Sequence, residues 1–193
     1  MKRILLAGLL GGLVVFGWSA ISHMVLPLGE AGIRTIPDEP AMMNALRTHV
    51  PGPGLYFFPG YDQKVERTKE QEEAAMKDWS DRYRLGPTGI LVIAPANRQP
   101  MSPSQFVVEL VTNILAAAIA AMLLFLAAAA IPKYSVRVLF VTMLGVFAFI
   151  VIDLSHWNWY GFPDTYTCAA LIDQTVGWFL GGLVIARIIR PPV

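Results

Sequence analysis

Residues 113–131, NILAAAIAAMLLFLAAAAI, form an unbroken run of uncharged and mostly apolar residues that stops at Pro132. Because a helix rises about 1.5 Å per residue, about 20 apolar residues are enough to cross the ~30 Å hydrocarbon core of a bilayer. Outward from this run in both directions, three further apolar runs occur, at 4–22, 136–155 and 165–186. The sequence therefore predicts four transmembrane helices, within residues 1–24, 105–132, 135–156 and 165–187.

The overall composition also indicates a membrane protein. Of the 193 residues, 55% are hydrophobic and only 15% are charged, whereas an ordinary soluble domain has about 25% charged residues. Nine of the fifteen Lys and Arg residues and ten of the fourteen Asp and Glu residues lie between residues 28 and 104. We therefore expect residues 25–104 to form a soluble domain. No basic patch indicates a nucleic-acid partner.

The remaining six basic residues occur in three short segments, before the first run, between the second and third, and after the fourth. These segments contain no Asp or Glu, and their basic residues are Lys2, Arg3, Lys133, Arg137, Arg187 and Arg190. Short segments rich in Lys and Arg stay in the cytoplasm. The pattern predicts a multi-pass protein with both termini in the cytoplasm and the 25–104 domain on the outer side.

The first apolar run has a second interpretation. Lys2 and Arg3 followed by apolar residues are also typical of a cleaved signal peptide. We favour an uncleaved helix, because the run continues to Met24 without a small-x-small cleavage site or a lipobox cysteine.

Small residues recur at four-residue spacing in two of the predicted helices. Gly8 and Gly12 form a GxxxG pair in the first, and Gly177 and Gly181 form another in the last. Such pairs let helices approach closely, either to a partner's helix or within one chain. We favour packing among the chain's own four helices.

The middle segment has the pattern of a small α+β domain. Helices are expected at 39–49 and 62–84, and strands at 54–59 and 89–95, with Gly and Pro gathered between them. Trp79 and Tyr83, four residues apart, are expected to face the core of this domain or a partner. The only cysteine, Cys168, excludes an internal disulfide. The predicted fold class is thus an all-α membrane bundle of four transmembrane helices with a small α+β extracytoplasmic domain between helices 1 and 2.

Ionisable residues are expected to gather at the outer ends of the four helices. A charge inside hydrocarbon costs at least ~2.5 kcal/mol, so such residues usually pair, face the interior of a bundle or bind a ligand. Imidazole and carboxylate together suit a transition metal such as Zn, Mn, Fe or Cu, a haem, or a proton relay. We favour structural packing of these polar groups over such a site. The candidate metal ligands are His23, Glu109, Asp153, His156 and Asp173.

Two segments resemble a known family. WSAISHMVLP at 18–27 and NWYGFP at 158–163 are similar to segments of a family of small bacterial inner-membrane proteins that have no assigned activity. The resemblance covers the first, third and fourth helices with their flanks, and loosely the 54–59 strand. It implies a bacterial cytoplasmic membrane and a four-helix architecture, and it supplies no catalytic residues.

Three functional hypotheses follow. The first is a non-catalytic accessory or assembly protein. It would use its outer domain and small-residue helix faces to hold another membrane or periplasmic protein, or a second copy of itself, among the membrane lipids. The second is a metal, haem or proton-relay site at the outer membrane face, and the third is a small oligomeric transporter. No HExxH, CxxCH, GxSxG or P-loop motif indicates a named enzyme.

Overall fold

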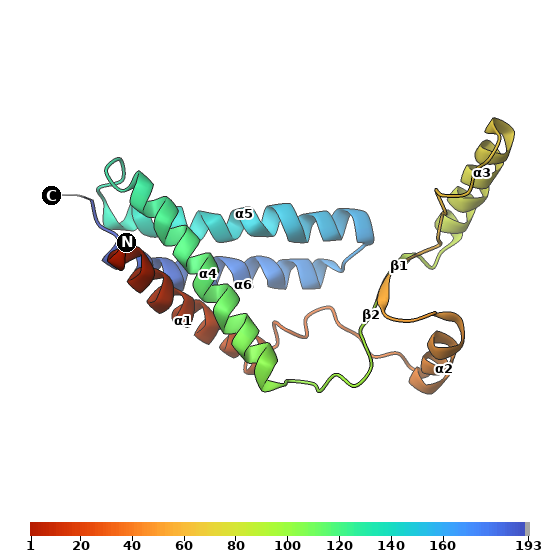
Figure 1. Cartoon of the computed structure of the whole chain (residues 1–193), viewed down its shortest axis with the longest axis horizontal. Helices are drawn as coiled ribbons and strands as arrows, with labels where there is room; N and C mark the ends of the chain where they lie inside the picture. The colour runs from red at the N-terminus through yellow and green to blue at the C-terminus, as the bar shows by residue number, and fades with distance from the viewer. Residues whose placement is uncertain (192–193) are drawn as a thin grey trace. The chain divides into compact units, whose positions relative to one another are not determined.

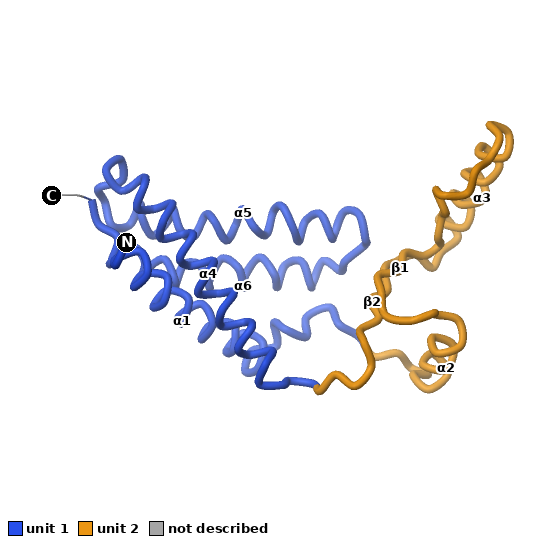
Figure 2. Tube along the Cα trace, in the orientation of Figure 1, with its two compact units in different colours: residues 1–34, 100–193 blue, residues 35–99 orange. Residues whose placement is uncertain are grey.

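The structure, a computed structural model, describes residues 1–191 and divides into two compact units. Figure 2 shows them as unit 1, residues 1–34 with 100–193, and unit 2, residues 35–99. Residues 25–34, which we expected in the soluble domain, therefore belong to unit 1. Unit 1 contains four helices long and apolar enough to cross a membrane, which confirms that part of the prediction: α1 (Lys2–Met24), α4 (Pro103–Ala127), α5 (Tyr134–Tyr160) and α6 (Asp164–Ile188).

Local signals fix where these helices begin and end. The backbone N–H of Ser102 donates to Oε1 of Gln105 at 2.8 Å, as in a capping box, at the start of α4. Helix α5 continues past residue 156, where we expected it to end, and stops at Gly161. The φ angle of Gly161 is +69°, a left-handed conformation that glycine adopts without strain.

The helices of unit 1 pack in a definite order. Helix α1 lies against α4 and α6, and α5 lies against α6. In Figure 1 the pair α1 and α4 meets the pair α5 and α6 at the end where the chain starts, and the two pairs diverge toward the other end. The apolar core lies at the first of these ends and consists mainly of small residues: Ala7, Ala117, Ala120, Ala121, Leu124, Ala128, Val138, Val141, Ile185, Ala186 and Ile189. We call the opposite end, at Met24, Pro103 and Tyr160, the distal end.

Glycines allow the close approach of α1 to its neighbours. A Cβ atom added at Gly12 would lie 2.5 Å from the Cα of Ile114, and one at Gly8 would lie 2.7 Å from the Cβ of Ala118. On α6, a Cβ at Gly181 would lie 2.7 Å from the side chain of Val15. The small-residue pairs thus pack the chain's own helices, as we expected.

Arg137 is buried at the core end, with only 5% of its surface exposed. Its guanidinium donates to the carbonyl oxygens of Pro132 at 2.6 Å and Ile131 at 3.2 Å, and to that of Ala186 at 3.4 Å. Ala186 lies in the last turn of α6, where unpaired carbonyls favour a cation. Arg137 therefore joins the α4–α5 connection to the end of α6.

Unit 2 contains α2 (Glu39–His49), β1 (Gly54–Phe58), α3 (Lys69–Leu85) and β2 (Gly89–Ile93). The two strands pair antiparallel, with Gly54 opposite Ile93 and Phe58 opposite Gly89, which confirms the small sheet.

Helix α3 begins at Lys69, seven residues later than predicted. Before it, the Asp62 carboxylate accepts the backbone N–H of Lys64 at 2.9 Å, a local turn that competes with helix. The backbone N–H of Thr68 then donates to Oε1 of Gln71 at 3.0 Å and caps the helix.

Candidate functional sites

A polar cavity of about 170 Å³ lies near the distal end of unit 1. The end of α1, the segment that follows it, α5 and α6 all contribute residues to its wall. Apolar atoms of Leu28, Gly29, Ala169 and Ala170 complete a lining whose polar members are His23, Asp153, Tyr166, Asp173 and Gln174. Three of the five predicted ligands therefore meet around one cavity.

Asp173 has the least satisfied side chain in this cavity. Its Oδ1 atom is buried and is the one buried side-chain polar atom among residues 1–191 that has no hydrogen-bond partner. The amide of Asn113 on α4 does not serve it, because that amide donates to Glu109 at 2.9 Å. A buried carboxylate oxygen without a donor is costly, which makes Asp173 a candidate ligand-binding residue.

Contacts within its own helix hold Nδ1 of His23. This atom lies 3.1 Å from the carbonyl oxygen of Ser19 and 2.8 Å from Oγ of Ser22. A protonated Nδ1 donates to the Ser19 carbonyl oxygen, and an unprotonated Nδ1 accepts the hydroxyl hydrogen of Ser22. In both tautomers these contacts involve Nδ1 and leave Nε2 for other partners.

Gly29 fixes where the His23 ring can lie. A Cβ atom added at Gly29 would be 2.8 Å from Cδ2 of His23, so the ring rests directly on the backbone of the segment after α1. The position of this imidazole therefore depends on a residue without a side chain.

The other two predicted ligands lie elsewhere. Glu109 is exposed and lines a separate, open hollow together with Met24, Gln105 and Phe106. His23 lines both this hollow and the polar cavity. The ring of His156 stacks on Phe162 with centroids 5.1 Å apart. Among residues 1–191, no three His, Cys, Asp or Glu side chains are grouped so that they would hold a metal ion.

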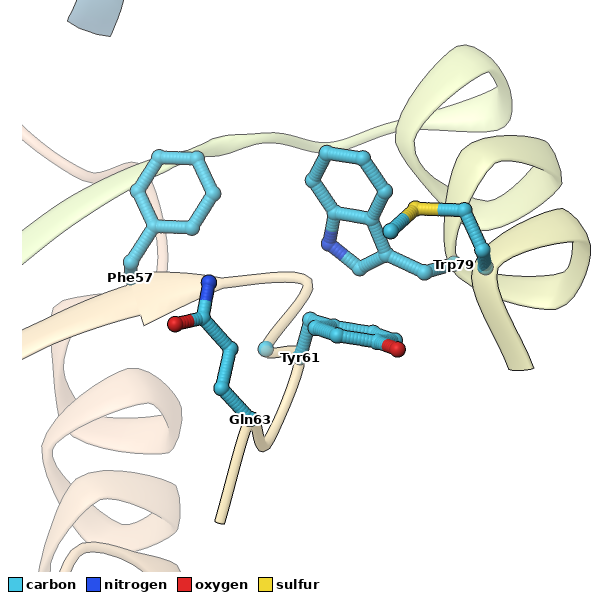
Figure 3. A pocket seen from close by; sticks show the side chains of 6 residues that line it. Phe57, Tyr61, Gln63 and Trp79 are labelled. Atoms are coloured by element: carbon cyan, nitrogen blue, oxygen red, sulfur yellow. The ribbon is translucent and has the colours of Figure 1, made fainter. Parts of the chain in front are cut away.

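Unit 2 has a second candidate site, an aromatic pocket of about 360 Å³. Figure 3 shows the rings of Phe57, Tyr61 and Trp79 grouped around it, with the Gln63 side chain beside them. Met76 of α3 completes the wall together with Gly60. The pocket thus forms between the end of β1, the loop that follows it, and one face of α3.

Hydrogen bonds hold the aromatic rings in place. The indole N–H of Trp79 donates to the carbonyl oxygen of Pro59 at 3.0 Å. The phenol of Tyr61 donates to the Glu72 carboxylate, and its ring meets Trp79 edge-on with centroids 6.1 Å apart. These bonds leave the apolar surfaces of the rings as the wall of a preformed pocket.

None of the residues from 35 to 99 is buried. Large apolar side chains are exposed on both strands, with Leu55 71% and Val92 70% exposed, and at the end of α3, where Leu85 is 85% exposed. A two-stranded sheet is marginal in water by itself, and a unit of this size depends on the core that it can bury. Unit 2 therefore lacks the buried core that would stabilise it alone.

Sequence reasoning found part of each site. It placed Trp79 and Tyr83 on one face of α3, and their rings do pack with Tyr61 and Phe57. It missed Tyr166 in the polar cavity, for which the sequence carries no distinct signal. The aromatic cluster YFFPGY at 56–61 was a signal for the second pocket that we did not use.

No family model, curated protein or solved structure matches this chain.

Proposed function

We propose that this chain is an integral inner-membrane accessory or assembly protein, which is not an enzyme and holds another protein through unit 2. The observation that carries the proposal is that unit 2 buries none of its own residues and yet has a preformed aromatic pocket. Surfaces of this kind mark protein interaction sites. A partner that covers them would supply the apolar burial that the unit lacks.

The membrane topology supports this placement of unit 2. Six basic residues lie outside residues 28–104, and all six are at the core end of the four helices. The chain enters and leaves unit 2 at the distal end of the helices. Under the rule that Lys and Arg are retained inside, both termini are cytoplasmic and unit 2 projects from the outer side of a bacterial cytoplasmic membrane. Its partner is then a periplasmic protein or the outer part of a membrane protein.

The chemistry of unit 2 indicates which segment of a partner it would hold. At about 360 Å³ the pocket lies at the small end of the range for ligand sites, so it suits one large apolar side chain. Met76 also belongs to a neighbouring hollow on α3, lined by Glu72, Glu73 and Asp81 and by a single cation, Lys77. The Lys77 amine already pairs with Asp81 at 2.9 Å. We therefore expect an extended segment with an aromatic or aliphatic anchor next to Lys or Arg.

The sheet offers a way to bind such a segment. Strands β1 and β2 pair only with one another among the described residues, so each has one free edge. Extended peptides add to free edges through main-chain hydrogen bonds, while side-chain pockets give specificity.

A photo-crosslinking residue at position 63 tests this proposal in the full-length protein in its own membrane. We expect one major protein adduct, whose crosslinked peptide contains an apolar residue beside Lys or Arg. Replacing Trp79 with Ala should abolish the adduct, and replacing the 70% exposed Trp159 of α5 with Ala should not. Adducts only between two copies of this chain, or only with lipid, would contradict the proposal.

Hydrogen exchange of the purified full-length protein gives a second test. Amides of residues 35–99 should exchange fast when the protein is alone and slow down when the crosslinked segment is added as a synthetic peptide. Slow exchange in the protein without the peptide would mean that unit 2 is stable by itself, and the central argument would fail.

A further inference from the structure

We propose that the polar cavity of unit 1 binds a primary ammonium group, R–NH₃⁺, between Asp153 and Asp173. This inference concerns a different unit from the proposed partner site and does not depend on it.

The charges around the cavity favour a cation. Its lining includes two carboxylates and no Lys or Arg, and His23 is the only lining residue that can become positive. The ion pairs recorded among residues 1–191 all lie between Arg67 and Arg82, far along the chain from either Asp. The charges of Asp153 and Asp173 are therefore not balanced by a basic side chain of the cavity.

The unsatisfied oxygen is an independent observation that points to a ligand. Oδ1 of Asp173 is buried and lacks a donor, although the carbonyl oxygen of the same residue accepts the indole N–H of Trp18 at 3.1 Å. Buried polar atoms without partners are rare in folded proteins. A donor supplied by a bound molecule would satisfy this atom and the local charge together.

A primary ammonium group fits this lining better than a metal ion or a quaternary ammonium. An ammonium has three N–H donors, and the wall offers acceptors on Asp153, Asp173 and Gln174. Protonated at Nδ1, a neutral His23 ring would add Nε2 as a further acceptor for the same ligand. No metal-binding group of three such side chains occurs among residues 1–191. A quaternary ammonium has no N–H to donate, so it would leave Asp173 unpaired.

The size of the cavity limits the ligand. At about 170 Å³ it holds the volume of about five or six waters, at about 30 Å³ each. Sites for drug-sized ligands start near about 300 Å³. A group of the size of ethanolammonium fits, either as the headgroup of a phospholipid or as a free small amine. In the membrane orientation proposed above, the distal ends of the helices point toward the outer headgroups, so both sources would approach the cavity from that end.

Native mass spectrometry of the full-length protein in detergent tests the proposal. The probes are phosphatidylethanolamine and phosphatidylcholine with identical acyl chains, and free ethanolamine and free choline. We expect retention of the ethanolamine form in preference to the choline form by about tenfold, the value of a charge-assisted hydrogen bond. Retention of the lipid alone identifies a headgroup site, and retention of free ethanolamine as well identifies a site for small amines.

Matched variants separate this site from general lipid binding. Asp173→Asn and Asp153→Asn each keep the side-chain size and should remove the preference for the primary amine. Asp164→Asn is the control, because Asp164 begins α6 but hydrogen-bonds to Trp157 and does not line the cavity. If Asp173→Asn fails to fold, the proposal is still tested by Asp153→Asn and by the comparison of ethanolamine and choline forms in the wild-type protein. Equal retention of both headgroups by the wild-type protein, with no retention of free ethanolamine, would overturn the proposal.

Discussion

The indole nitrogen of Trp18 donates a hydrogen bond to the backbone carbonyl oxygen of Asp173 at 3.1 Å and so joins α1 to α6. One turn further along α6, a Cβ atom added at Gly177 would lie 2.9 Å from Cδ1 of the same indole. The ring therefore lies against the backbone of α6, at the residue that also faces the polar cavity. This arrangement leads to the first prediction.

Gly177→Ala should destabilise the protein by about 1–3 kcal/mol, because the added methyl group must displace the Trp18 ring. Trp18→Phe should cost about 0.5–1.5 kcal/mol through the lost hydrogen bond. Thermal unfolding in detergent measures both. Gly17→Ala is the control, since a Cβ there meets nothing within 4 Å. A Gly177→Ala protein as stable as the Gly17→Ala protein would contradict the packing described above.

Gly12→Ala should separate α1 from α4. The new Cβ would meet backbone atoms of Ile114, at 2.5 and 2.7 Å, and backbone cannot move aside as a flexible side chain does. We expect a loss of stability of about 1–3 kcal/mol or more, as for overpacked cores. The distance between spin labels on α1 and α4 should also be larger in the Gly12→Ala protein than in the wild-type protein. Unchanged spacing and stability would show that the two helices do not approach this closely.

Arg137→Ala should be among the most damaging single changes in unit 1. It removes the donor for the buried carbonyl oxygen of Ala186, and an unsatisfied buried acceptor costs about 1–3 kcal/mol. It also removes the bonds to the partly buried carbonyl oxygens of Ile131 and Pro132. Arg137→Lys should recover only part of the loss, because one amine replaces a planar group with five donors. The exposed Lys133 provides the control as Lys133→Ala. Equal unfolding temperatures for the Ala variants at 133 and 137 would exclude this role.

The Tyr61 phenol should titrate above its ordinary range. The hydrogen bond to the Glu72 carboxylate, with a smaller effect of desolvation, raises the pKa of Tyr61. The bond is complete below the ordinary tyrosine pKa, near about 10, and its stabilising effect is lost as the pH rises through the raised value. Ultraviolet titration should therefore show a late tyrosine component from Tyr61, and Glu72→Gln should return the pKa of Tyr61 toward its ordinary value. Superimposable titrations of the two proteins would exclude this hydrogen bond in solution.

A reporter fused after residue 191 should be active only in the cytoplasm, and one inserted between Arg84 and Gly89 only outside. The physical reason is that the six basic residues in the short segments at the core end are retained in the cytoplasm. Replacing Lys133 with Glu should weaken this orientation more than the same change at Lys64 in unit 2. A carboxyl-terminal reporter that is active only in the periplasm would place unit 2 in the cytosol.

The helices were largely predictable because their signal is local. Long apolar runs identify α1, α4, α5 and α6, and the Thr68 capping box was also present in the sequence for the start of α3, although helix propensity alone placed that start too early. The site was less predictable, because it depends on helix divergence. Whether Glu109 shares a cavity with Asp173 is decided by the separation of α4 from α6 at the distal end, and no sequence period encodes that separation.

The position of the apolar core has a mechanical consequence for unit 1. Most members of the core cluster lie toward one end of the helices, whereas the distal half of unit 1 buries fewer side chains, among them Phe149, Thr167 and Ala169. A movement of the distal end would therefore disturb less buried apolar area than a movement of the core end, and it would cost correspondingly less free energy. The hydrogen bond from Trp18 to Asp173 still joins α1 to α6 beside the cavity.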